Sequence, residues 1–391
     1  MLLSVGTLGA YPAGRDRLPT ATVGYNENRR PSTPGSQPYR FLLIADHRWL
    51  MAKPMNREKY SRQILFKPIG VEGQEKLLRA KVVIVGCGAL GTAQAQALAR
   101  AGVGTLRIVD RDYVEESNLQ RQMLFDEADA AQSLPKAVAA ERKLKGINSD
   151  VRVEGIVTDA DSRNIEELVE GFDVILDATD NFEARYLVND IAVKLAIPWI
   201  YGAVVASYAT TLTILPGRTP CLACVFPKPP QGLHDTCDTV GVISPAVSWA
   251  AAIQVTEALK ILIGREQDLH GSLLAYDLWA NRFQQVRPKI DPECRACGKR
   301  DFIHLEAGGP IHISMCGRNS VQIHQREARE LDLAALKTRL EQFGPVRANE
   351  FLLKCALDPY ELTVFPDGRA IIKGTQDPAI ARGLYAKYIG S

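Results

Sequence analysis

The sequence lacks the features that would place the protein in a membrane or on a nucleic acid. No apolar run approaches the ~18 residues that span a bilayer, and no basic residue precedes the apolar stretch at the start, so it makes a poor secretory signal. The 47 basic residues nearly balance the 45 acidic residues, for a net charge of +2. This balance excludes a global attraction to nucleic acid or to anionic lipid. We expect a cytoplasmic globular protein with neither kind of partner.

Histidine is also scarce, whereas cysteine is grouped. The six histidines are spread along the chain, and we nominate none as catalytic. Of the eight cysteines, four form two Cys-x-x-Cys pairs: Cys221 with Cys224, and Cys294 with Cys297. In a cytosolic chain of this size, such pairs indicate a metal more often than disulfides. They fit a closed, structural four-thiolate zinc site; a redox pair or ordinary buried thiols are the alternatives.

Three stretches of different composition divide the 391 residues. Residues 1–54 hold six prolines and no sustained hydrophobic period, which predicts a flexible leader. A mis-assigned start is the alternative, because Met55 would open a compact domain directly. Residues 55–300 form one predicted domain, and residues 301–391 form a small α+β domain.

The fold class follows from strands that alternate with helices. Such alternation predicts an α/β, Rossmann-like and mainly parallel sheet with helices on both faces. Residues 246–263 form one long, nearly all-apolar helix, which suggests burial. The predicted strands are 81–86, 105–110, 151–154, 173–178, 198–201 and 210–215, with helices at 90–101, 135–146 and 162–170. In the tail we predict strands at 319–325, 351–357, 361–365 and 369–373, a hairpin turn at 366–368, and helices at 332–343 and 377–388.

A nucleotide fingerprint stands between the first strand and its helix. Gly86, Gly88 and Gly91 form a GxGxxG motif, whose glycines allow a tight turn and a close approach of phosphate to the helix N-terminus. Asp110 ends the next strand, where an acid can accept hydrogen bonds from a ribose. A glycine turn that serves only packing is the alternative.

The choice between NAD and ATP depends on the charges that follow. An NAD site needs little beyond the fingerprint, whereas ATP calls for cations and a metal ligand. Arg121, Lys136 and Asp180 supply these charges, and Asp180 follows the end of a strand. An NAD-dependent oxidoreductase is the alternative, and it has no use for these charges or for the paired cysteines.

These motifs together resemble the MoeB/ThiF adenylyltransferases, relatives of ubiquitin-activating enzymes. The resemblance runs from about Met55 to Gly298, and the tail resembles the C-terminal extension of Bacillus-type members. The segments that carry it are Tyr60-Ser-Arg62-Gln-Ile64, the glycine loop, Ser117-Asn-Leu-Gln-Arg121-Gln122, Pro135-Lys136, Thr179-Asp180-Asn181 and the cysteine pairs.

The resemblance implies an activity and a set of roles. The protein would adenylylate the C-terminal Gly-Gly carboxylate of a ubiquitin-like sulfur carrier, either ThiS-like for thiamine thiazole or MoaD-like for molybdopterin. A cysteine desulfurase would be a possible sulfur donor. Asp110 would bind the ribose and Asp180 would position Mg²⁺. Arg62 would reach the neighbouring subunit's site in a homodimer. The implied ATP-binding set is Gly86, Gly88, Ala89, Gly91, Asp110, Ser117, Asn118, Leu119, Gln120, Arg121, Lys136, Asp180 and Asn181.

Cys237 has two open interpretations. It lies in a polar stretch after a proline-rich segment, where a loop over the site is expected. Relatives bond the carrier covalently through a cysteine at this position, and a thiolate there could attack an acyl-adenylate. A bystander cysteine is the alternative. A third kind of function, a non-catalytic partner-binding subunit, is disfavoured because every ATP-contacting position is present.

Overall fold

The computed structural model describes residues 55–228, 237–306, 312–315, 319–323 and 331–390. The segment predicted to be a leader, 1–54, lies outside these residues. Within the described part of the chain, no helix is long and apolar enough to cross a bilayer.

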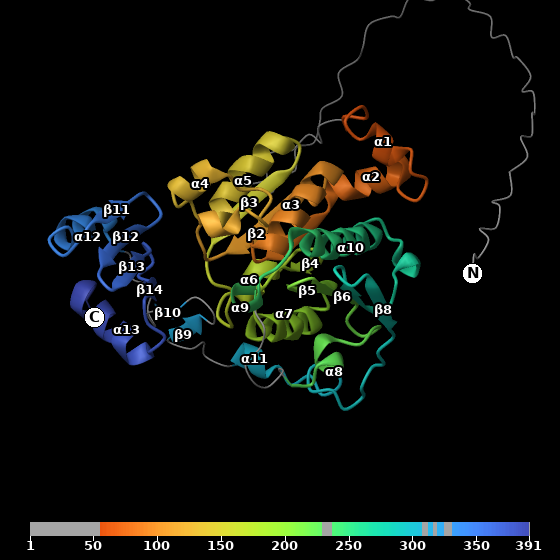
Figure 1. The fold of residues 1–391 in the computed structure, drawn as a ribbon. Helices are drawn as coiled ribbons and strands as arrows, with labels where there is room; N and C mark the ends of the chain where they lie inside the picture. The colour runs from red at the N-terminus through yellow and green to blue at the C-terminus, as the bar shows by residue number, and fades with distance from the viewer. Residues whose placement is uncertain (1–54, 229–236, 307–311, 316–318, 324–330, 391) are drawn as a thin grey trace, which may run out of the picture. The chain divides into compact units, whose positions relative to one another are not determined.

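An eight-stranded sheet organises the larger part of the protein (Figure 1). Its strand order is β3-β2-β1-β4-β5-β6-β7-β8; the first five strands run parallel, and β6, β7 and β8 add on as an antiparallel meander. The predicted mainly parallel sheet is confirmed. The strands are β1 (Lys81–Val85), β2 (Thr105–Asp110), β3 (Arg152–Val157), β4 (Val174–Asp177), β5 (Trp199–Val205), β6 (Tyr208–Ile214), β7 (Leu273–Asp277) and β8 (Arg282–Val286).

Helices cover both faces of this sheet, as predicted. Four of them pack on one face around β-branched side chains such as Ile84 and Ile108: α2 (Gly70–Arg79), α3 (Ala89–Ala101), α5 (Lys136–Ile147) and α10 (Ser244–Leu262). The other face is covered by α6 (Ile165–Val169), α7 (Phe182–Leu195) and α8 (Leu222–Val225). The short helices are α1 (Ser61–Ile64), η1 (Glu116–Asn118), α4 (Glu127–Ala131), α9 (Cys237–Val240), η2 (Glu266–Asp268) and α11 (Ile303–Glu306).

Local chemistry accounts for the main predicted helices. Gly102 ends α3 in the left-handed conformation at φ 79°, and its N–H and that of Val103 close the last turn. The predicted long helix forms as α10, but its burial is not all-round. Ser248, Ala252 and Thr256 make an exposed stripe at four-residue spacing, because α3 and the sheet cover only the other sides.

The tail forms a second, antiparallel sheet of order β11-β12-β13-β14-β10-β9. The hairpin turn predicted at 366–368 connects β13 to β14, with Gly368 at φ 82°. The tail elements are β9 (His312–Met315), β10 (Ser320–Ile323), α12 (Leu333–Leu340), β11 (Val346–Ala348), β12 (Leu353–Leu357), β13 (Tyr360–Val364), β14 (Ala370–Lys373) and α13 (Pro378–Tyr388). Helices α12 and α13 pack on the sheet through Leu340 and Tyr385.

Candidate functional site

The glycine loop joins β1 to α3, and its three glycines differ in what surrounds them. A Cβ at Gly86 would lie 2.4 Å from the Ala178 carbonyl oxygen, and a Cβ at Gly91 would lie 2.2 Å from the Gly86 carbonyl oxygen. These two glycines are required for packing. A Cβ at Gly88 would meet only the Gln122 amide nitrogen, at 3.9 Å. Gly88 is the N-cap of α3, so space remains where a helix N-terminus can receive an anion.

Asp110 ties the end of β2 to this loop. Its carboxylate accepts hydrogen bonds from the Cys87 N–H at 2.5 Å and from the Asp112 N–H at 2.7 Å. Burial raises the pKa of Asp110, and the positive charge of Lys136 acts in the opposite direction. Asp110 therefore lies beside the glycine loop, at the carboxyl edge of the sheet where such folds bind ligands.

Lys136 begins α5 and is almost fully buried, with 3% of its surface exposed. Its Nζ lies 3.2 Å from Asp112 Oδ2, and its carbonyl oxygen lies 3.8 Å from the Cys87 Sγ. A buried ammonium is costly unless it is paired. The structure thus holds a paired cation against the glycine loop.

Residues 178–181, which follow β4, form the next part of the site. Because the Ala178 carbonyl touches Gly86, the residues up to Asp180 lie beside the glycine loop. Asp180 is exposed and accepts a hydrogen bond from the Asn181 side chain at 3.2 Å. Asn181 is the N-cap of α7, where its side chain accepts from the Ala184 N–H at 2.8 Å.

The segment 117–122 lies beside the glycine loop at Gln122, whose side-chain amide faces Gly88. Asn118 is buried, and its side-chain oxygen accepts from the Glu115 N–H at 3.2 Å. Arg121 is half-buried and donates to the Ser117 carbonyl at 2.8 Å. Leu119 and Gln120 continue this turn. Of this segment, Gln122 is the residue placed against the glycine loop, while the Arg121 guanidinium binds the backbone of its own turn.

Two arginines of this region were missed by the sequence analysis. Arg111 Nη1 lies 2.8 Å from Asp159 Oδ2. Burial lowers the pKa of Arg111, but the charges of Asp159, Asp112 and Asp180 outweigh burial and raise it. Arg185 is buried 3.4 Å from Asp177 and donates to the Thr179 carbonyl at 2.9 Å. The position of Arg185 one helical turn after Asn181 was a usable signal, whereas no sequence pattern distinguishes Arg111 from a surface arginine.

The two cysteine pairs meet at one point. All four Sγ atoms lie within 4.8 Å of one another, at separations that include 3.5 Å for Cys221–Cys294 and 3.3 Å for Cys224–Cys297. A tetrahedral zinc with Zn–S bonds of about 2.3 Å would set its sulfurs about 3.8 Å apart. Burial and the neighbouring thiols raise the pKa of Cys221 to about 12. The cluster has the ligand set and spacing to hold a metal ion.

One other predicted residue, Arg62, lies apart from this region. Arg62 is exposed on α1, and the adjacent Gln63 donates to the Ala101 carbonyl at the C-terminal end of α3. Since the glycine loop is at the N-terminal end of α3, Arg62 is about 20 Å from it along a 13-residue helix. Cys237 is the first residue of α9; its side chain and residues 229–236 lie outside the described part of the chain.

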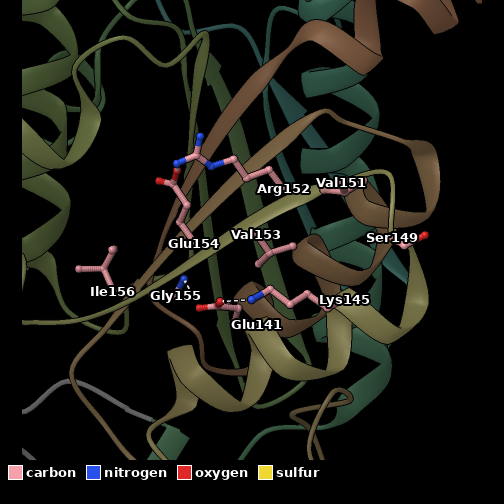
Figure 2. Close-up of a pocket in the computed structure, with 9 residues that line it drawn as sticks. All are labelled: Glu141, Lys145, Ser149, Val151, Arg152, Val153, Glu154, Gly155 and Ile156. Carbon is pink, nitrogen blue, oxygen red and sulfur yellow. Dashed lines mark hydrogen bonds and ion pairs between the residues drawn. The ribbon is translucent and has the colours of Figure 1, made fainter. Parts of the chain in front are cut away.

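A separate cleft of about 620 Å³ lies along the edge strand β3 and α5 (Figure 2). It contains none of the predicted site residues. Glu141 accepts from the Gly155 N–H at 2.9 Å, and Glu154 pairs with Arg152 at 2.8 Å. Charged side chains at a sheet edge discourage pairing with another chain, which explains this arrangement without a ligand.

Comparison with known proteins agrees with the motifs. The profile of the ThiF family matches residues 60–296. The chain belongs to the ThiF family. It is 51% identical over 337 residues, 85% of this chain and 99% of the relative, to the sulfur carrier protein ThiS adenylyltransferase of Bacillus subtilis (strain 168). A sulfur carrier protein adenylyltransferase of Thermus thermophilus is 39% identical over 64% of this chain and 95% of its own length.

The fold is shared with a solved ThiF-like structure. The crystal structure of E. coli MccB with ATP superposes at a TM-score of 0.54, with 26% identity, over 62% of this chain and 75% of MccB. The predicted family and fold class are confirmed. The relatives are named as adenylyltransferases, so the oxidoreductase alternative has no support from them.

Proposed function

We propose that this ThiF-family protein adenylylates the C-terminal Gly-Gly carboxylate of a ubiquitin-like sulfur carrier, using ATP and releasing pyrophosphate. One observation supports the proposal most: the backbone at Ala178 and Thr179, just before Asp180, and the start of α5 at Lys136 both lie against the glycine loop. The Bacillus subtilis relative, named for this activity, supports it.

The residues present fit a nucleoside triphosphate. Gly88 and Ala89 would offer backbone N–H groups to phosphate, and Asp110 would accept from the ribose. Asp180, exposed at the rim, has the oxygen ligands that Mg²⁺ prefers. Mg²⁺ would neutralise charge on the phosphates. Further phosphate contacts would come from Ser117, Asn118, Leu119, Gln120, Arg121, Lys136 and Asn181.

The chemistry needs positive charge more than it needs a base. A carboxylate is ionised at pH 7, so the attacking group has no proton to lose. The barrier lies in an anion approaching an anion, and cations placed beforehand at the phosphates lower it. Lys136 and Arg121 hold that charge in place before the substrates bind.

The position of Arg62 supports a homodimer. It is too far from the glycine loop of its own chain to touch a nucleotide there. Its neighbours Leu65 and Phe66 are 69% and 60% exposed, an apolar surface suited to a second copy. We propose that Arg62 completes the site of the partner subunit.

Mixing two inactive variants tests this arrangement. Arg62→Ala and Arg121→Ala are each expected to lose activity. After the subunits are exchanged, half of the dimers are mixed and each mixed dimer holds one intact site, so about a quarter of the wild-type activity should return. No recovery, with mixed dimers shown by mass spectrometry, would place Arg62 outside the partner's site.

We also propose that the four-cysteine cluster binds zinc, in the reducing cytoplasm where thiols stay free. Cys237 is proposed to attack the carrier's acyl-adenylate, forming a thioester as AMP leaves, with a cysteine desulfurase as the sulfur donor. The resemblance of the tail favours a ThiS-like carrier over a MoaD-like one. Cys237→Ala should keep carrier activation and lose any thiol-sensitive conjugate; an unchanged conjugate would exclude Cys237 as its attachment point.

Exchange of labelled pyrophosphate into ATP tests the central proposal. Purified protein would be incubated with ATP, Mg²⁺ and ThiS-like or MoaD-like carriers that end in Gly-Gly. Exchange that depends on a carrier identifies the substrate, and a carrier without its last glycine is the control. Absence of exchange with every carrier would count against the activity. Arg121→Ala should abolish exchange, and near-normal exchange would refute its phosphate role.

A further inference from the structure

The tail sheet buries the segment that leads away from Asp110. Tyr113 packs against Leu352, Phe365 and Ile371, and each of the four side chains is at most 4% exposed. The Lys354 ammonium lies 3.7 Å from the centre of the Tyr113 ring. Residues 111–115 connect the predicted ribose acid to the loop at 117–122. One wall of the nucleotide site is therefore packed against the tail.

Arg369 is the most deeply inserted charge at this contact. It follows the turn between β13 and β14, is 2% exposed, and donates from Nη1 to the Arg111 carbonyl oxygen at 2.9 Å. Its guanidinium lies 4.0 Å from the centre of the Phe365 ring. Burial lowers the pKa of Arg369, and the charges of Asp367 and Asp159 oppose that shift. An arginine stays charged in proteins, so its burial must be compensated by these partners.

A chain of polar contacts runs from the tail to Lys136. Gln322 of β10 donates to Asp159 Oδ2 at 3.4 Å, the same oxygen that Arg111 contacts. Arg111 precedes Asp112, and Asp112 pairs with Lys136. The tail therefore constrains Arg111 in two ways. Arg369 binds its backbone carbonyl, and Gln322 binds Asp159, the partner of its side chain.

We propose that Arg369 is a positioning residue for the nucleotide site. By holding the Arg111 carbonyl, it fixes the direction in which Asp110 and Asp112 present their carboxylates. Asp112 in turn sets the position of the Lys136 ammonium. The inference rests on the proposed function, because the positions of these groups matter only if a nucleoside triphosphate binds among them. The tail is then part of the ATP site although it touches no substrate.

Binding of ATP without the carrier is the direct test. The full-length protein is titrated calorimetrically with Mg²⁺ and α,β-methylene-ATP, and the exchange assay then gives separate KM values for ATP and for the carrier. Arg369→Gln is expected to weaken ATP binding and raise the KM for ATP about tenfold, equivalent to about 1.4 kcal/mol. The KM for the carrier should stay unchanged while the KM for ATP rises, a split that a general loss of folded protein, which lowers only the apparent kcat, would not produce.

Arg382→Gln is the matched control, since Arg382 is an exposed arginine on α13 of the same tail. It should match the wild type in every measurement. If Arg369→Gln fails to fold, as judged by circular dichroism and gel filtration, Arg369→Lys and Gln322→Ala decide the matter. Each should raise the KM for ATP about threefold, the lower end of the effects seen for residues that act through others.

Two results would overturn the inference, and they are distinguishable. If the wild type binds the ATP analogue and the folded variants bind it equally well, Arg369 has no positioning role and the proposed function stands. If the wild type binds no nucleotide, the proposed function fails and the inference fails with it.

Discussion

Replacing Arg295 by alanine is expected to destabilise the protein more than replacing an exposed charged residue would. Arg295 lies between Cys294 and Cys297, and its two Nη atoms each lie 2.9 Å from an Asp190 carboxylate oxygen. Asp190 is on α7 and has no exposed surface, whereas the Arg295 side chain is 24% exposed. The pair connects the cysteine cluster to α7, whose N-cap is Asn181.

The size of the effect follows from what the change leaves behind. Removing one partner of a buried ion pair costs about 3–5 kcal/mol, because the remaining charge is uncompensated. The partial exposure of Arg295 lets water reach the site, so we expect the lower end, about 3 kcal/mol. In Arg295→Ala with Asp190→Asn, no bare carboxylate remains. That double variant should lose less stability than Arg295→Ala alone.

Urea unfolding at a fixed zinc concentration measures both effects. Lys299→Ala is the control, because Lys299 forms an exposed pair with Glu293 and should change the free energy of unfolding by less than about 1 kcal/mol. The reasoning would be refuted if Arg295→Ala also lost less than that, or if the double variant were the least stable of the set.

Three further predictions concern the metal, the phosphates and pH. The proposed four-thiolate site predicts that Cys297→Ser lowers the metal content measured by elemental analysis and lowers the melting temperature; an unchanged metal content would refute that site. Lys136→Ala should slow pyrophosphate exchange about 100-fold, the effect of removing one preorganised cationic donor. Lys145→Ala, on the exposed face of the same helix, should leave exchange unchanged, and equal effects of the two would contradict the assignment. Burial lowers the pKa of His270 below its ordinary 6.5, so the unfolded chain binds the proton first as pH falls. The free energy of unfolding should therefore decrease as pH drops below about 6.5, with a smaller decrease in His270→Gln. An identical pH profile in that variant would exclude His270 as the source.

Local patterns were sufficient for much of the fold. The β-branched run at 81–85 and the glycines after it define β1, the loop and α3 within one continuous stretch. The hairpin turn at 366–368 was likewise predictable from its own three residues. By contrast, β8 was not predicted, because all five of its residues are exposed and lack strand alternation. It forms because β7 offers an antiparallel edge. Helix α7 was missed although its cap at Asn181 was readable.

The sequence by itself determined the residue types and their local order: a glycine loop after a strand, an acid at the end of the next one, and two cysteine pairs. These depend on neighbours within a few residues, so periodicity and motif spacing reveal them. Only the tertiary structure decided which distant side chains share an environment. Arg369 reaches Arg111 across 258 residues, and Gln322 reaches Asp159 across 163. Such contacts arise from how sheets and helices pack, and no local pattern encodes them.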